Sequence, residues 1–66
     1  MNRDDLQREH RLTDEQTERV FAAGKLLVRC GYSPAAAGKV VGTFIGRGAD
    51  PLTGVKILLR QQGKIR

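Results

Sequence analysis

Several residue types that stabilise small proteins are scarce in this chain. Its 66 residues include one cysteine, one histidine, no tryptophan and only three aromatic side chains. Cys30 has no partner for an internal disulfide, and together with His10 it supplies too few ligands for a structural zinc site. We therefore expect no metal and no cofactor, and a fold that depends on helix packing, on dimerisation or on a partner.

Long apolar runs are also missing. No stretch approaches the ~18 apolar residues that a membrane span needs, and residues 1–12 are charged, unlike a secretory signal. A free thiol suits a reducing compartment. Together these features predict a cytoplasmic protein without a membrane partner. Gly38, Gly42 and Gly46 have the spacing of membrane helix pairs, but the charges of Lys39 and Arg47 favour close packing in a soluble protein.

Acidic residues are almost absent from the larger part of the chain. Residues 1–19 carry four arginines and six carboxylates, a net charge of −2, whereas residues 20–66 carry eight basic residues and Asp50 alone, a net of +7. Such an excess favours a polyanion partner such as nucleic acid. Small proteins also carry net charge for solubility, so charge alone leaves both interpretations open.

Helix start and stop signals divide the chain into three segments. Thr13 followed by Gln16 forms a capping box, and Ser33-Pro34 and Asp50-Pro51 each place a capping side chain before a proline in the first helical turn. Glycines follow the expected ends of these segments. These signals predict three helices, at residues 13–30, 34–47 and 51–62.

The apolar pattern predicts an all-α protein, a small three-helix bundle formed by residues 13–66. Apolar residues cover more than half of the circumference of the first helix. This helix should therefore be central and have other helices packed on two of its sides. Residues 1–12 have few apolar anchors and are expected to form a loose N-terminal arm, either a frayed helix or a disordered segment. Two glycines inside the second helix, Gly38 and Gly42, each cost ~1 kcal/mol relative to alanine. We expect a neighbouring backbone to approach them closely, and a homodimer contact is one way to supply it.

Catalysis finds little support. The potential nucleophiles have only His10 as a base, and it lies in the expected arm. The paired acids Asp4-Asp5 and Asp14-Glu15 suit solvent-facing helix starts. The glycine-rich segment 46–54 lacks the Lys-Ser/Thr ending of a phosphate-binding loop and does not follow a strand. The sequence therefore predicts that the protein is not an enzyme.

The junction between the first two helices is the most informative feature. The first helix is followed by a short turn that contains Gly31 and then by a second helix with its own N-cap. This order is a helix-turn-helix-like arrangement. On the second helix, basic and hydroxyl side chains recur every four residues on the face opposite the apolar stripe, as a DNA-reading helix requires. An ordinary solvated face would also carry such residues. The predicted nucleic-acid-binding residues are Ser33, Lys39, Thr43, Arg47, Lys56 and Arg60.

The run Leu26 to Ala37 resembles the N-terminal helix-turn-helix of phage small-terminase subunits, which has an Ala-Gly-Tyr-Ser-x-x-Thr-Ala turn and a proline-led third helix. The likeness covers roughly residues 20–60. Ala36 stands where the family usually has threonine, the gap to Pro51 is a few residues longer, and no oligomerisation region follows. The resemblance implies DNA binding, in a phage or plasmid setting, rather than DNA packaging.

The segment 31–37 is also similar to ubiquitin-associated-type bundles, including the C-terminal domain of the bacterial RuvA junction protein. That resemblance implies a protein-binding adaptor or inhibitor, acting on a host protein or on one that processes nucleic acid. Such bundles bind through the first turn and the third helix. The corresponding contacts here are Gly31, Tyr32, Ile57 and Leu58.

Overall fold

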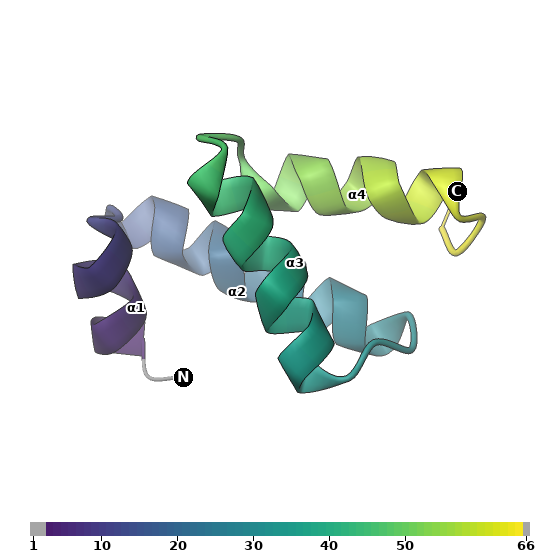
Figure 1. Cartoon of the computed structure of the whole chain (residues 1–66), viewed down its shortest axis with the longest axis horizontal. Coiled ribbons are helices and arrows are strands. Elements are labelled where there is room, and N and C mark those ends of the chain that lie inside the picture. The colour runs from purple at the N-terminus through teal and green to yellow at the C-terminus, as the bar shows by residue number, and fades with distance from the viewer. Residues whose placement is uncertain (1–2, 66) are drawn as a thin grey trace.

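The computed structural model describes residues 3–65, with the side chains of Arg3 and Leu6 left undescribed, and this part of the chain is all-α (Figure 1). The expectation of a small helical bundle is confirmed. Within the described residues, no helix is both long enough and apolar enough to cross a membrane. The helices are α1 (Arg3–His10), α2 (Asp14–Arg29), α3 (Pro34–Gly46) and α4 (Pro51–Gln61).

The predicted caps set the ends of the three longer helices. The Thr13 hydroxyl accepts from the Gln16 backbone N–H, while the Gln16 side chain accepts from the Thr13 N–H, so the capping box is complete. Ser33 caps α3 by accepting from the Ala36 N–H, and Asp50 caps α4. Each predicted helix therefore begins and ends within a residue of its expected position.

The core lies where α3 and α4 both pack against α2, as expected for a central first helix. In Figure 1, α3 crosses in front of α2, and α4 runs along the upper side of the molecule. Thr17 is also fully buried, and its hydroxyl donates to the Thr13 carbonyl, which removes the cost of burying it. The buried apolar side chains are Val20, Ala23, Leu27, Ala37, Val41, Val55 and Leu59.

The N-terminal segment contains a short helix. Residues 3–10 of the expected arm form α1, which packs against α2, and the half-buried Leu12 contacts the core; Met1 and Asn2 lie outside the described residues. The chain turns between the two helices at Arg11, whose φ is 53°. A positive φ normally calls for glycine, so the sequence carries no visible signal for this turn.

The expected close approach of a neighbouring backbone to Gly38 and Gly42 of α3 is not found among the described residues. A Cβ built on Gly38 or Gly42 would meet nothing within 4 Å, so no backbone among the described residues approaches either glycine closely. The close approach occurs at Gly54 of α4, where a Cβ would lie 2.7 Å from two ring carbons of Phe44. Gly54 therefore lets the Phe44 ring lie against the α4 backbone and fixes how α3 and α4 pack.

Candidate functional site

The turn between α2 and α3 contains the predicted glycine stop and serine cap. Cys30 ends α2, and Gly31 adopts a φ of 101°, which favours glycine. The Tyr32 backbone N–H then donates to the Leu27 carbonyl at 3.0 Å. With Ser33 capping the next helix, these bonds fix the direction in which α3 leaves α2.

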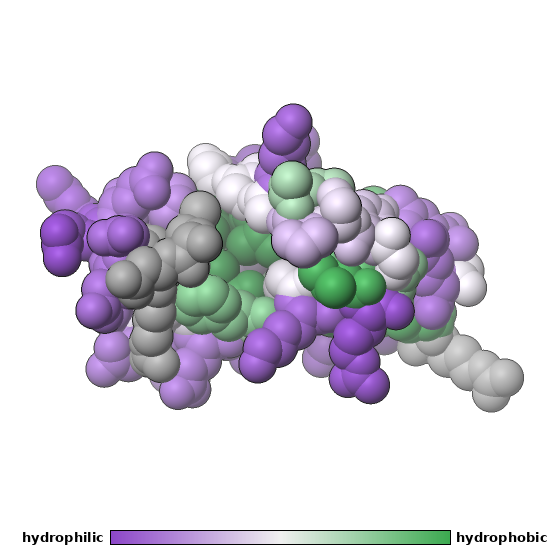
Figure 2. Space-filling view, turned by 90° about the horizontal axis from the view of Figure 1, so that it is seen from below, coloured by the Kyte–Doolittle hydropathy of each residue, from purple (hydrophilic) through white to green (hydrophobic). Residues whose placement is uncertain are grey.

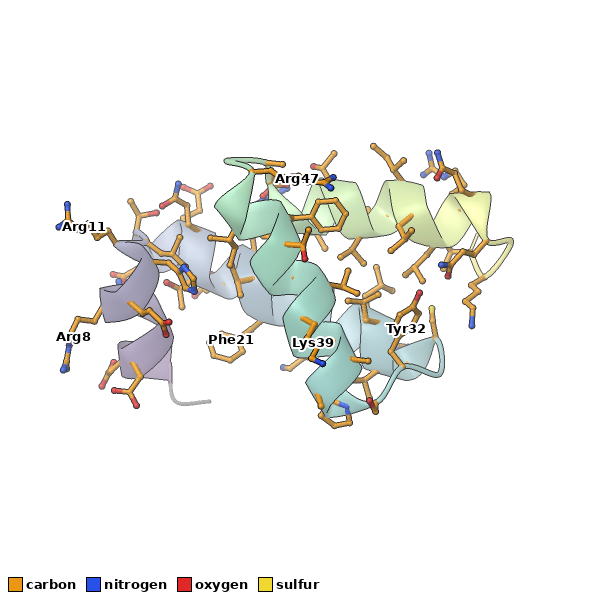
Figure 3. All side chains as sticks on the ribbon, in the orientation of Figure 1. Arg8, Arg11, Phe21, Tyr32, Lys39 and Arg47 are labelled. Atoms are coloured by element: carbon orange, nitrogen blue, oxygen red, sulfur yellow. The ribbon has the colours of Figure 1, made fainter. Side chains whose placement is uncertain are left out.

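The outward face of α3, together with its C-cap Arg47, carries three of the predicted contacts. Lys39, Thr43 and Arg47 are all exposed, and Figure 3 shows Lys39 on the front of α3 and Arg47 at its far end. The Thr43 hydroxyl donates to the Lys39 carbonyl at 2.9 Å, which fixes its position and leaves its oxygen free to accept a hydrogen bond. We call these three residues the α3 basic face.

Three other predicted contacts do not join this face. The Ser33 oxygen accepts from the Ala36 backbone N–H at 3.1 Å and serves as the helix cap. Gly54 marks the side of α4 that faces α3, since its α-carbon lies against Phe44. At about 100° per residue, Lys56 lies about 200° and Arg60 about 120° around α4 from Gly54. Both are exposed, but they lie on the side turned away from α3.

The carboxylate that follows the α3 basic face in the sequence is already engaged. Asp50 is the only acid among residues 20–66. It accepts from Nε and Nη2 of Arg19 at 2.8 and 2.6 Å, and from the Thr53 hydroxyl at 2.7 Å. The hydrogen bond from Arg19 and then those from Thr53 hold the pKa of Asp50 well below its usual range. The α3 basic face therefore has no neighbouring carboxylate from this part of the chain to compete with a bound anion.

A second surface was not anticipated from the sequence. An open groove of about 870 Å³ runs between α2 and α3. Figure 2 looks onto this side of the molecule, where apolar residues lie in the middle and hydrophilic ones along the border. The sequence feature that could have indicated this groove is the wide apolar arc of α2, because the core covers only part of that arc. The groove is lined by His10, Val20, Phe21, Gly24, Lys25, Val28, Arg29, Pro34, Ala35, Ala37, Gly38, Lys39, Val41, Gly42 and Ile45.

The alternative protein-binding residues lie near the end of α4. The Tyr32 hydroxyl donates to the Gln62 side chain at 2.9 Å, and the Lys64 ammonium lies 5.5 Å from the centre of the Tyr32 ring. Tyr32 is thus engaged in joining the turn to the C-terminal end of the bundle. Leu58 is half-buried and Gly31 is exposed, while Ile57 is 50% exposed. Of these four residues, Ile57 offers the most free apolar surface.

Comparisons with protein-family models, curated proteins and solved structures find no match to this chain. The two resemblances therefore stay predictions. Among the described residues, no group of three or more potential metal ligands comes together. The α3 basic face and the groove beside it are both exposed surfaces of the described residues.

Proposed function

We propose that this protein binds duplex DNA, with the α3 basic face as the element that contacts the nucleic acid. The observation that carries the proposal is the exposure of Lys39, Thr43 and Arg47 along one side of a helix. In helix-turn-helix proteins, the second helix of the motif enters the major groove and its side chains contact phosphates and base edges. No catalytic step is part of the proposal.

Charge and shape both support this role. The lysine and the arginine can neutralise phosphates, and arginine also matches the acceptor pair of guanine. The small residues Ala36 and Gly46 flank this face, and they leave room for the helix backbone to approach a surface. Asp50, the one acid beyond residue 19, is neutralised by Arg19. The net positive charge of this part of the chain would also speed its encounter with DNA.

The test compares the parent protein with the double variant Lys39→Ala, Arg47→Ala. Fluorescence anisotropy of a labelled duplex of mixed sequence reports binding at low salt, and far-ultraviolet circular dichroism reports helix content. Both side chains are exposed, so the variant should keep its fold and lose most of its affinity. A parent protein that binds no duplex at low salt, or a variant that binds as tightly as the parent, would contradict the proposal.

A further inference from the structure

The groove between α2 and α3 has an apolar floor that remains accessible to solvent. Phe21 and Ile45 are half-buried, and Val28 is 44% exposed. Phe21 projects from α2 toward the side viewed in Figure 2, as Figure 3 shows. Exposed apolar residues are unremarkable when scattered, but these residues line one continuous groove. A continuous apolar groove on a small domain is the kind of surface that takes up a partner's apolar side chains.

Three glycines without side chains line this groove and make it wider and shallower. Gly24, Gly38 and Gly42 line it, and a Cβ at any of them would meet nothing within 4 Å. Each glycine inside a helix costs ~1 kcal/mol relative to alanine, and no close packing by residues 3–65 at these three positions offsets that cost. Glycine is suited to sites where another molecule must approach the backbone closely. The three glycines therefore leave the backbones of α2 and α3 open to close approach by an occupant of the groove.

The charges along the groove identify the chemistry of the occupant. Lys25, Arg29 and Lys39 lie among its lining residues, and none of the described residues that line it is an aspartate or a glutamate. A two-fold contact with a second copy would bring the same surface, and hence the same cations, face to face. A partner carrying carboxylates beside an apolar stripe would instead complement both the rim and the floor. Duplex DNA presents phosphates but no apolar stripe to cover the floor.

We propose that the α2–α3 groove binds an amphipathic helix of a partner protein, with acidic residues flanking its apolar stripe. The stripe packs on Phe21, Val28 and Ile45, and the carboxylates pair with the basic rim. The α3 side of the groove, from Pro34 to Ile45, is ~16 Å long at 1.5 Å per residue. It therefore accommodates about three turns of helix, with apolar anchors at positions i, i+3 or i+4, and i+7.

This inference does not depend on DNA binding, because Phe21 and Val28 belong to α2 and lie outside the α3 basic face. Only Lys39 borders both surfaces. A variant at Val28 therefore tests the groove and leaves the proposed DNA contacts in place. Ile57 provides the matched control, since among the described residues it is a large apolar residue with a similarly exposed side chain and it does not line the groove.

The probe is a labelled synthetic helix of about 14 residues, long enough for the groove at 1.5 Å per residue, with leucines along one stripe and glutamates on both flanks. A second peptide replaces every glutamate with lysine. Anisotropy should show the glutamate peptide binding at least about tenfold more tightly than the lysine peptide, a difference of ~1.4 kcal/mol. Val28→Glu should weaken binding of the glutamate peptide by at least the same factor, whereas Ile57→Glu should change it by less than about twofold.

Several results would overturn the inference. They are no binding of the glutamate peptide up to about 1 mM, equal binding of the two peptides, or equal effects of Val28→Glu and Ile57→Glu. Concentration-dependent self-association of the parent that Val28→Glu abolishes would assign the groove to a second copy instead. Loss of duplex binding in Val28→Glu, with circular dichroism unchanged, would assign it to nucleic acid.

Discussion

Substitution by alanine should affect stability differently at Gly42 and at Gly54. Both lie inside helices, so alanine at either position should gain the same ~1 kcal/mol of helix propensity. Their surroundings differ, because a Cβ at Gly42 would meet nothing within 4 Å, whereas at Gly54 it would lie 2.7 Å from the Phe44 ring. Carbon atoms pack best at ~3.5–4.0 Å, so Phe44 would have to move by about 1 Å.

The expected magnitudes follow from these contacts. Gly42→Ala should raise the free energy of unfolding by ~1 kcal/mol, which is ~4–8 °C in Tm for a domain of this size. Overpacking usually costs ~1–3 kcal/mol, so Gly54→Ala should gain nothing or lose up to ~2 kcal/mol once the propensity gain is included. The difference between the two variants reports the Phe44 contact alone, since the propensity gain cancels.

Urea denaturation followed by circular dichroism measures both variants. Equal stabilisation of the two would refute the packing of Phe44 against α4. Destabilisation by Gly42→Ala would show that the groove is occupied in the free protein. Repeating the measurement across protein concentrations would then identify a second copy as the occupant, because dimer stability depends on concentration.

Three further predictions concern contacts elsewhere in the fold. Since Arg19 lowers the pKa of Asp50, their pair stabilises the fold above the unfolded-state pKa of ~3.9 and loses this effect as the pH falls below that value. Asp50→Asn, which keeps a capping oxygen, should flatten this part of the pH dependence of Tm, and an unchanged acid profile would contradict it. Arg11→Gly should stabilise the chain by ~0.5–1 kcal/mol in urea denaturation by relieving the positive φ, whereas a loss would argue against that turn. Tyr32→Phe should cost less than ~1 kcal/mol by the same measurement, because its bond to Gln62 is exposed; a larger loss would give this contact a structural role.

The fold was largely predictable because its determinants are local. Thr13, Ser33 and Asp50 each cap a helix where the sequence places a capping residue. The α1 helix was harder to predict, since few apolar residues distinguish it from a polar arm and Arg11 occupies a turn that glycine usually marks. Capping residues define where helices begin and end, but they do not determine whether a polar segment such as α1 packs against the rest of the bundle.

The candidate site was predictable only in part. The spacing of Lys39, Thr43 and Arg47 identified one exposed face of α3 because helical periodicity alone determines it. The directions of Lys56 and Arg60 depend on how α4 rolls against α3, and the contact between Gly54 and Phe44 sets that roll. The groove depends on which part of the α2 apolar arc remains uncovered, and this is a property of the assembled helices.

The most direct test of DNA binding by the α3 basic face is the salt dependence of affinity for duplex DNA. Lys39→Ala, Arg47→Ala removes two positive charges from that face, and Lys56→Ala, Arg60→Ala removes two from the far side of α4. Each lost phosphate contact should reduce the slope of log affinity against log salt by ~0.9, so the first variant should lose ~1.8. The second should keep most of the parent slope. Equal reductions in the two variants, or none in the first, would contradict DNA binding by this face of α3.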